Sequence, residues 1–546
     1  MHETPLFFHT AWKGGVLVKR KTYGIFFLLL LLLGGACVSL GRAATQEEYV
    51  AAAGNQGLYR LDVAQGRGTI YDRNLSPLVG GKTQYVAAVA PTIEAIGALE
   101  TVTQGQYREQ LALALENGKP FQVTLETPVE DPRVDVFQVP RRYEEEQLAP
   151  HIVGYLDSLG RGASGVELAM DDVLAQYGGE ISVTYQVDAV GRAIAGMRRQ
   201  VTNTLQDTEG GVALTLDSSI QQLVQEAAQS LEKGAVVVTK VPTCEILALA
   251  SVPDFSPLEL EEATVGEDSP LINRGFSAYA PGSVWKLVTA AALLEEGMGE
   301  LTTTCTGILS VEGLDFHCIN STAHGEVDLQ RALEQSCNCY FIHAAQLLGG
   351  EKILSLAARL GFGEAQEFGR GLWTASGTLP TRATLSNARA LANFSFGQGE
   401  LTVTPLQLCA MMNTLVSGGT YTSPSLIAGL VDEGKEQTPL TPSNQRKEQV
   451  LSVETASTLG QILLSAAQVG TGRPGAPEGV SVGIKTGTAQ TGVQEGEEEL
   501  LHFWYCGFVS GAGGPRYCIT VLAESTPDDR GAAARVFRQV AAALGA

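Results

Sequence analysis

Three patterns of hydrophobic and polar residues follow one another along this chain. The first is a continuous apolar run: residues 23–40 carry no charge, and Ile25 to Leu33 are all aromatic or aliphatic. A helix of about 20 apolar residues can span a bilayer. The run therefore predicts a transmembrane anchor over residues 23–40.

The second pattern places apolar residues at helical spacing beyond residue 210, where it predicts a helix over residues 217–231. The residues that share one face of this helix are Ile220, Leu223, Val224, Ala227 and Leu231. The candidate residues for its N-cap are Asp217, Ser218 and Ser219. A helix with one apolar face is expected to pack against a sheet or other helices.

The third pattern consists of short runs of strand-forming residues. Residues 235–241 and 245–252 predict two strands, joined by a turn at Pro242-Thr243-Cys244. Near the C-terminus the same pattern predicts three strands and a closing helix, over residues 480–488, 503–509, 517–523 and 536–544. The sequence between the two groups of strands is mostly helical. The chain therefore predicts a mixed α/β domain over residues 211–546, with an antiparallel sheet built from both ends and a helical insertion.

Residues 41–210 are more polar and mixed than the rest of the chain. They contain short strand-like runs, at residues 84–89 and 121–125. The stretch 203–211 is polar and contains glycine, which places a domain boundary there. A chain of 546 residues is too long for one ordinary domain, so we interpret residues 41–210 as a separate domain.

The charge distribution restricts both the partners and the location of the protein. The formal net charge of −22 argues against a nucleic-acid partner, because phosphate binding requires a basic surface. Lysine and arginine precede the apolar run, whereas Glu47 and Glu48 follow it. The positive-inside rule then places residues 1–22 in the cytoplasm and the remainder outside. The alternatives are a signal peptide cleaved near residues 41–44 and a lipidation site at Cys37, and both would also export the chain.

Nine cysteines are scattered through the sequence. No pair has the spacing of a zinc ribbon, and Cys337-Asn338-Cys339 is too tight for a zinc clip, so we predict no metal site. Cys305 and Cys318 flank a 12-residue stretch that a disulfide worth ~3 kcal/mol could close outside the cell. The alternative is a pair of reduced thiols. We predict that Cys337 packs in the core.

The first candidate for chemistry is Ser283. Pro281-Gly282 forms a turn before an apolar helix, so Ser283 lies at the first helical turn with Lys286 on the same face. A serine nucleophile needs an adjacent base, and a buried lysine can serve as one. The alternative is an N-cap serine followed by a surface lysine. Ser230 and Lys233 have the same spacing, but they lie at a helix end before a strand.

Two further motifs strengthen the case for Ser283. Ser336-Cys337-Asn338 is the only Ser-x-Asn in the chain and can place a hydroxyl and an amide in one cleft. Lys485-Thr486-Gly487 is the only Lys-Thr-Gly and follows a predicted strand. Gly487 would let a substrate backbone approach closely, while Lys485 and Thr486 offer donors to an anion. Taken alone, a Ser-x-Asn motif is most often a polar turn, and a Lys-Thr-Gly motif is more often an exposed strand end.

In this order, the three motifs resemble the signature of β-lactamases and penicillin-binding proteins. The spacings of 53 residues (336 − 283) and 149 residues (485 − 336) are similar to those of penicillin-binding transpeptidases. Further stretches resemble class B penicillin-binding proteins, namely residues 66–74, 154–155, 165–167, 188–192, 324–329, 397–399 and 404–407. The resemblance extends from about residue 60 to the end of the chain.

The resemblance implies a penicillin-binding/serine β-lactamase-like transpeptidase domain over residues 211–546, preceded by an elongated α+β pedestal domain over 41–210. It also implies a peptidoglycan D,D-transpeptidase inhibited by β-lactams. Ser283 would be the nucleophile, Lys286 its base, Ser336 a proton relay and Asn338 a ligand of Lys286 and the donor peptide. The residues implied to bind the donor carboxylate or line its site are Lys485, Thr486, Gly487 and Thr488.

The implied partners are peptidoglycan stem peptides, β-lactams, a membrane-embedded glycan polymerase, and proteins of the division or elongation complex. No metal or organic cofactor is implied, and the expected location is the cell membrane with the catalytic domain outside. The first alternative is a D,D-carboxypeptidase or β-lactamase of the same fold. A class A β-lactamase needs a glutamate to activate water, and we interpret the nearest candidate, Glu351, as a solvated helix residue. The second alternative is a non-catalytic β-lactam sensor or scaffold.

Overall fold

The computed structural model describes residues 13–45, 57–205, 210–265, 268–432, 434–440, 445–496, 498–527 and 530–546. Contacts divide the chain into two compact units. The first comprises Met1–Ala64, Gln84–Val139 and Glu180–Asn203, and the second comprises Gln65–Thr83, Pro140–Gly179 and Thr204–Ala546. The units alternate along the chain. The last change between them, from Asn203 to Thr204, lies in the stretch where the boundary is predicted, whereas Gln65–Thr83 and Pro140–Gly179 belong to the second unit.

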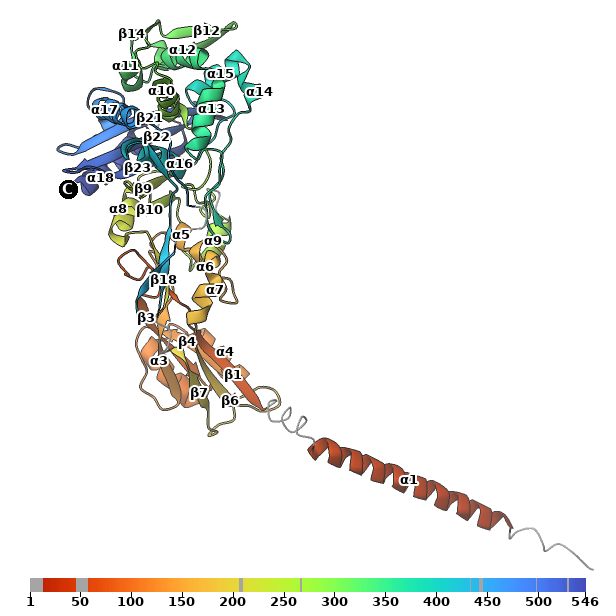
Figure 1. The fold of residues 1–546 in the computed structure, drawn as a ribbon. Coiled ribbons are helices and arrows are strands. Elements are labelled where there is room, and N and C mark those ends of the chain that lie inside the picture. The colour runs from red at the N-terminus through yellow and green to blue at the C-terminus, as the bar shows by residue number, and fades with distance from the viewer. Residues whose placement is uncertain are drawn as a thin grey trace, which may run out of the picture. The chain divides into compact units, whose positions relative to one another are not determined.

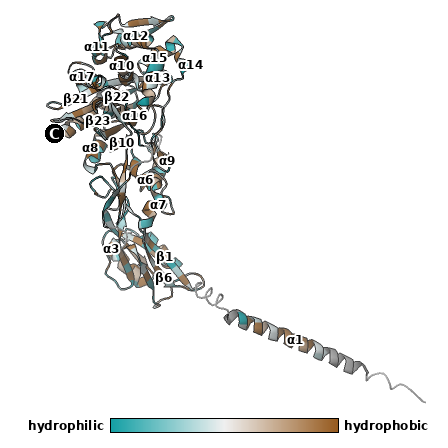
Figure 2. Ribbon diagram, viewed as in Figure 1, coloured by the Kyte–Doolittle hydropathy of each residue, from teal (hydrophilic) through white to brown (hydrophobic). Residues whose placement is uncertain are grey.

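The N-terminal helix α1 runs from Lys13 to Thr45. Its apolar part, Thr22–Arg42, is long and apolar enough to cross a membrane. The large side chains from Ile25 to Leu33 are exposed, and their hydrophobic character can be followed along α1 in Figure 2. The helix predicted over residues 23–40 is therefore present, and its exposed apolar surface is suited to anchoring in a bilayer.

The first unit contains two small sheets with their helices (Figure 1). The order of one sheet is β4-β3-β5, formed by Phe121–Leu125, Lys82–Val89 and Val134–Arg141. The helices α3 (Ile93–Thr103) and α4 (Arg108–Asn117) share a core with this sheet. The order of the other sheet is β1-β6-β7, formed by Leu58–Gln65, Glu180–Gln186 and Gln200–Asn203. The strands predicted at residues 84–89 and 121–125 are confirmed.

The second unit is built around a five-stranded antiparallel sheet with the order β10-β9-β23-β22-β21. Its strands are β9 (Gly234–Lys240), β10 (Ile246–Val252), β21 (Ser481–Glu495), β22 (Glu498–Gly511) and β23 (Gly514–Thr526). The N-terminal hairpin joins the C-terminal strands through β9 and β23, where Val237 lies opposite Thr520. The predicted sheet from both ends of the domain is confirmed.

Different helices cover the two faces of this sheet (Figure 1). Val236 and Val238 share one core with α8 (Ser218–Ala228) and α18 (Arg530–Gly545). Val237 belongs to the opposite core, which includes α16 (Pro405–Val416), because side chains alternate along a strand. Asp217 is the N-cap of α8 and accepts hydrogen bonds from the next turn. The predicted helices at residues 217–231 and 536–544 are therefore confirmed.

The helical insertion lies between β10 and β21. Its helices are α9 (Leu260–Val265), η3 (Gly282–Trp285), α10 (Lys286–Glu295), α11 (Leu329–Glu334), α12 (Asn338–Leu348), α13 (Gly350–Arg359), α14 (Arg382–Leu385), α15 (Ala388–Ser395), α16 and α17 (Val453–Val469). Its strand pairs are β11–β14 (Thr303–Cys305, Gly325–Val327), β12–β13 (Ile308–Val311, Leu314–His317), β15–β16 (Glu367–Gly369, Leu372–Trp373) and β17–β20 (Thr420–Thr422, Lys447–Gln449). Helix α10 is buried from Lys286 to Leu293, which makes it the centre of the insertion.

A four-stranded sheet joins distant segments of the second unit. Its order is β19-β18-β8-β2, formed by Gln437–Pro439, Ile427–Val431, Gly211–Leu214 and Thr69–Tyr71. Strand β2 runs parallel to β8, with Ile70 opposite Val212. Residues 69–71 therefore belong structurally with the C-terminal part of the chain.

A buried ionic network ties further segments into the second unit, close to the short helices α5 (Pro150–Val153), α6 (Gly165–Ala169) and α7 (Asp171–Leu174). The carboxylate of Glu167 on α6 is fully buried and lies 2.7 Å from Arg67 Nε and 2.6 Å from Arg142 Nη2. It also accepts a hydrogen bond from the Tyr143 hydroxyl at 3.2 Å. A buried carboxylate is tolerated only with such partners, so this network fixes the three segments together.

Candidate active site

The turn before Ser283 presses against strand β21. Gly282 has a φ of +52°, and a Cβ at this position would lie 2.3 Å from the carbonyl oxygen of Thr488. The N–H of Gly282 donates to the carbonyl of Gly397 at 3.0 Å. Only glycine permits both the positive φ and this close approach. The half-buried Ser283 is thereby placed at the start of the helical segment, beside the strand that carries Lys485.

Lys286 lies one turn after Ser283 and is completely buried. Its Nζ donates to the carbonyl of Ser336 at 2.7 Å, to Ser336 Oγ at 3.0 Å and to Asn338 Oδ1 at 2.6 Å. Burial lowers the pKa of Lys286 to about 8, since a buried environment disfavours its charged form. The amine is therefore fixed in position and can lose its proton near neutral pH.

The Ser336-Cys337-Asn338 segment forms the entry to helix α12. Ser336 is buried and has a φ of +55°, a left-handed conformation that is uncommon for a residue with a side chain. Asn338 begins α12, and its Nδ2 donates to the carbonyl of His317 at 2.7 Å. The amide of Asn338 is thus oriented by His317 on one side and by Lys286 on the other.

Lys485 approaches Ser336 from strand β21. Its Nζ donates to Ser336 Oγ at 3.2 Å and to the carbonyl of Thr486 at 3.0 Å. Burial, together with the positive charge of Lys286, holds the pKa of Lys485 well below its usual value. The structure therefore brings two lysines to one serine hydroxyl, although Lys286, Ser336 and Lys485 are far apart in the sequence.

The three motifs lie within a domain that is found in other proteins. Residues 234–542, more than half of the chain, match the family described as the penicillin binding protein transpeptidase domain. The chain belongs to this family. The matched residues contain Ser283, Lys286, Ser336, Asn338 and the Lys485–Thr488 segment.

Curated relatives of this transpeptidase-family chain support its assignment to class B of the penicillin-binding proteins. Stage V sporulation protein D of Bacillus subtilis is 30% identical over 362 residues, which cover 64% of this chain and 54% of that protein. The peptidoglycan D,D-transpeptidase PbpA of Mycolicibacterium smegmatis is 29% identical over 423 residues, covering 72% of this chain and 80% of that protein. The chain thus matches about half the length of the Bacillus protein and most of the Mycolicibacterium protein.

Solved structures confirm the predicted fold of this family member. Penicillin binding protein 3 of Mycobacterium tuberculosis superposes with a TM-score of 0.64 and 24% identity, covering 89% of this chain and 96% of that one. A transpeptidase from Eggerthella lenta superposes with a TM-score of 0.62 and 22% identity, covering 88% and 99%. At these identities the agreement concerns the fold alone.

Gly487 has a packing role in the structure that the sequence analysis did not consider. The sequence analysis assigned its missing side chain to close approach by a substrate backbone. In the structure, a Cβ at Gly487 would lie 2.8 Å from the carbonyl of Pro281 and 3.0 Å from Val284. The glycine therefore allows β21 to pack against the turn that carries Ser283.

Two polar residues of this transpeptidase-family site were missed from the sequence. Thr471 Oγ1 accepts a hydrogen bond from Thr486 Oγ1 at 2.8 Å, and the carbonyl of His317 orients Asn338 as described above. Thr471 lies between two glycines after α17, and His317 acts only through its backbone. Neither residue carries a sequence signal that distinguishes it from a turn residue.

For the cysteines, the sequence left a disulfide and reduced thiols open, and it predicted no metal site. All nine cysteines are free. The Sγ atoms of Cys305 and Cys318 are 3.7 Å apart, so these two residues are reduced thiols in the structure. Cys337 is completely buried. The side chains of Cys305, Cys318, His324 and Cys337 form a group that could hold a metal ion, their ligand atoms all within 4.8 Å of one another. The spacing rules missed it because the four residues come from separate elements.

Proposed function

We propose that this chain is a peptidoglycan D,D-transpeptidase, which cross-links stem peptides through an acyl-enzyme on Ser283 and is inhibited by β-lactams. The observation that carries the proposal is the buried amine of Lys286, which is hydrogen-bonded to Ser336 and Asn338 one turn away from Ser283. The Mycolicibacterium relative is named a peptidoglycan D,D-transpeptidase, and the M. tuberculosis structural neighbour has been solved with aztreonam and with ampicillin.

In the proposed acylation, Ser283 Oγ attacks the carbonyl of the penultimate residue of a D-alanyl-D-alanine stem peptide. Neutral Lys286 takes the serine proton, and its burial favours this neutral form. The backbone N–H groups of Ser283 and Thr488 form the oxyanion hole, because the contact at Gly282 brings their segments together. Each such donor is worth roughly 3–4 kcal/mol in comparable sites.

Ser336 then relays a proton to the leaving D-alanine amine. Its Oγ accepts hydrogen bonds from both Lys286 and Lys485, which leaves its own O–H as a donor toward bound substrate. The acyl group remains esterified to Ser283 as D-alanine departs. An amine of a neighbouring stem peptide attacks this ester, forms the new amide and returns the proton to the site, so Ser283 is regenerated.

Lys485, Thr486 and Thr488 bind the terminal carboxylate of the donor in this proposal. Lys485→Ala should slow acylation by about 10- to 100-fold, because a hydrogen bond to a charged group is worth about 1.5–3 kcal/mol. Stopped-flow acylation with a fluorescent penicillin measures this change. The matched control is Lys447→Ala, which removes an exposed lysine on β20 and should acylate normally. If circular dichroism showed Lys485→Ala to be unfolded, Lys485 would be a structural residue.

Among the hydrolytic alternatives, a class A β-lactamase needs a glutamate that activates the deacylating water. Glu351, the candidate considered from the sequence, is exposed on α13 and pairs with Arg382 at 2.5 Å. This surface ion pair favours an ordinary solvated role for Glu351. The sensor alternative is disfavoured because the amine of Lys286 donates hydrogen bonds to both Ser336 and Asn338.

The apolar helix α1 supports a location at the cell membrane. We propose a single-pass topology with residues 1–22 in the cytoplasm, since basic residues precede the apolar part and acidic residues follow it. The catalytic domain then faces the peptidoglycan outside the membrane. This location suits a partnership with a membrane-embedded glycan polymerase and with proteins of a division or elongation complex.

The function is tested with the full chain, a lipid-linked peptidoglycan precursor and a glycan polymerase, followed by digestion and mass analysis of the muropeptides. We expect cross-linked dimers that disappear when penicillin is added. Release of D-alanine, with pentapeptide monomers shortened to tetrapeptide monomers and no cross-linked dimers, would instead identify a carboxypeptidase. No change in the muropeptides would favour the sensor.

A further inference from the structure

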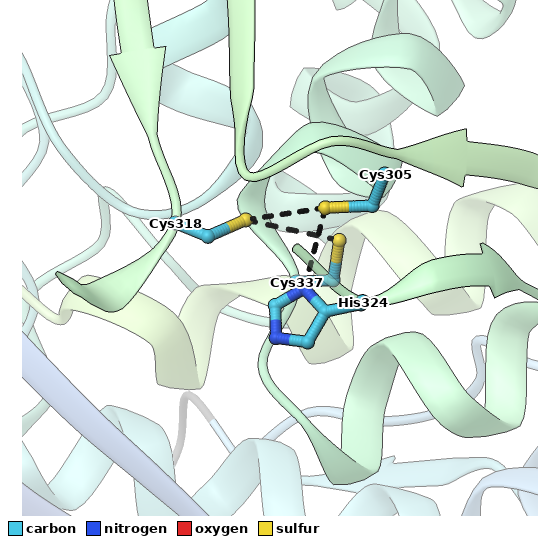
Figure 3. Close-up of side chains that lie close together, drawn as sticks. All are labelled: Cys305, Cys318, His324 and Cys337. Atoms are coloured by element: carbon cyan, nitrogen blue, oxygen red, sulfur yellow. Dashed lines mark hydrogen bonds between the residues drawn. The ribbon is translucent and has the colours of Figure 1, made fainter. Parts of the chain in front are cut away.

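The cysteine and histidine group shown in Figure 3 includes Cys337, the middle residue of the Ser-x-Asn motif. Cys305 ends β11, Cys318 follows β13, His324 precedes β14 and Cys337 is the N-cap residue of α12. Figure 3 shows their side chains directed toward one another from these separate elements. All three cysteines are buried, and His324 is half-buried.

The separations within this group fit the edges of a tetrahedron around one metal ion. Sγ atoms are 3.7 Å apart for Cys305 and Cys318 and 3.9 Å apart for Cys318 and Cys337. Cys305 Sγ lies 3.3 Å from His324 Nδ1. A tetrahedral Zn²⁺ with Zn–S bonds of about 2.3 Å and Zn–N bonds of about 2.0 Å has S–S edges of ~3.8 Å and S–N edges of ~3.5 Å.

The backbone near Cys305 is also shaped for this arrangement. The N–H of Gly307 donates to Cys305 Sγ at 3.4 Å, and the carbonyl of Gly307 accepts from the N–H of Cys318 at 2.9 Å. Gly307 has a φ of +90°, and a Cβ there would lie 2.2 Å from the carbonyl of Ser321. The N–H of Gly307 therefore helps to hold the sulfur of Cys305 in place within the group.

We propose that Cys305, Cys318, His324 and Cys337 bind one Zn²⁺ ion in a closed tetrahedral site. Three thiols and one imidazole are a ligand set typical of structural zinc. Binding releases the three thiol protons to solvent, uses neutral His324 through Nδ1, and involves no change of oxidation state. Zinc suits this set better than Mg²⁺ or Ca²⁺, which prefer oxygen ligands.

The site has a direct connection to the proposed chemistry. Cys337 stands between Ser336 and Asn338, the two residues that receive hydrogen bonds from Lys286. A metal bond at Cys337 would anchor this segment to the β11–β14 part of the insertion and hold Ser336 in its left-handed conformation. The zinc is thus a positioning element for Ser336 and Asn338. This consequence rests on the proposed transpeptidase function, whereas metal binding itself does not.

The same thiols could be arranged in two other ways, which the experiments below distinguish from the proposed zinc site. Cys305 and Cys318 could be oxidised to a disulfide, which requires their sulfurs to approach to about 2.05 Å. Cys339, whose Sγ lies 3.6 Å from Cys318 Sγ, could replace one of the four ligands. Removal of each cysteine separates these arrangements from the proposed one.

The first experiment measures metal in the full chain purified in detergent without added chelator. We expect about one zinc per chain by plasma mass spectrometry. Replacement by Co²⁺ should give the visible absorption of a tetrahedral ion together with thiolate-to-metal charge-transfer bands. Absence of stoichiometric metal with no such Co²⁺ spectrum, or a Cys305–Cys318 disulfide in protein alkylated during lysis, would overturn the proposal.

Single variants then test the ligands. Cys305→Ala and Cys318→Ala should each weaken Zn²⁺ binding by at least about ten-fold in competition with a chromogenic chelator. Cys339→Ala, within the same cluster, and Cys244→Ala, in another part of the core, are the matched controls and should keep one zinc. If Cys339→Ala lost the metal to the same extent as Cys318→Ala, the ligand assignment would be wrong.

The last experiment separates positioning of the motif from general stability. Chelation at low temperature should slow penicillin acylation by about 10- to 100-fold, because a shift of about 1 Å in a catalytic group can cost this much. Far-UV circular dichroism should not change, and added Zn²⁺ should restore the rate. Unchanged acylation in metal-free protein would refute the positioning role. Normal metal content in a protein that never forms cross-links would instead contradict the proposed function and leave the zinc site established.

Discussion

Ser283→Ala is expected to abolish covalent labelling by a fluorescent penicillin. The serine lies at the head of the segment that leads into α10, with the buried amine of Lys286 one turn later. A covalent acyl-enzyme requires the hydroxyl, so its removal eliminates the product and does not merely slow its formation. The measurement is a fluorescent band on a denaturing gel after long incubation at high penicillin concentration.

The matched control for this experiment is Ser230→Ala. Ser230 has a lysine three residues later, as Ser283 has, but it follows α8, and its hydroxyl donates to the carbonyl of Ala227. Lys233 pairs with Asp268 at the surface. Normal labelling of Ser230→Ala would show that the spacing alone does not make a nucleophile. A labelled band from Ser283→Ala would show that another residue is acylated.

Lys286→Ala should reduce the acylation rate by about 10²- to 10⁴-fold, the usual contribution of a positioned general base. Lys286→Arg should be equally inactive, because arginine keeps its proton at all accessible pH values. Lys352→Ala is the control, since Lys352 is a surface residue that pairs with Glu296 at 2.5 Å. Rapid acylation of Lys286→Arg would show that Lys286 acts by charge and not as a base.

The same assignment predicts the direction of the pH dependence. Burial lowers the pKa of Lys286 to about 8, so the neutral form that accepts the serine proton increases as pH rises through this value. The acylation rate of the wild-type chain should therefore rise between about pH 7 and pH 9 and then level off. Single-turnover measurements over this range check the profile. A rate that falls across the same range would contradict a neutral-lysine base.

The sequence predicted the sheet and the catalytic motifs because both depend on local patterns. Short runs of strand-forming residues identified the strands around Val236 and Val482, and the helical spacing after Asp217 identified α8. Ser283 and Lys286 share a helix face, so their relation follows from spacing alone. The resemblance to a known family rests on the order of the three motifs along the chain, which no single motif shows.

Other features could not be predicted because they depend on contacts between distant segments. Gly487 is a glycine because the carbonyl of Pro281 occupies the space of a side chain. His324 and Cys337 meet only after β14 and α12 have packed, and no spacing rule covers ligands that come from four elements. The alternation of the two compact units along the chain also depends on contacts between distant residues, since Ile70 of β2 pairs with Val212 of β8.

The parallel pairing of β2 with β8 has a consequence for excision of the catalytic part. A fragment that begins at residue 211 would lack β2 and would uncover an edge of the β19-β18-β8 sheet. It would also lose Asp72, whose carboxylate accepts hydrogen bonds from the N–H and hydroxyl of Ser218 at the start of α8. An uncovered strand edge is a template for aggregation. No single cut therefore releases the catalytic part as a soluble fragment, because its strand β2 lies in the sequence between segments that form the other unit.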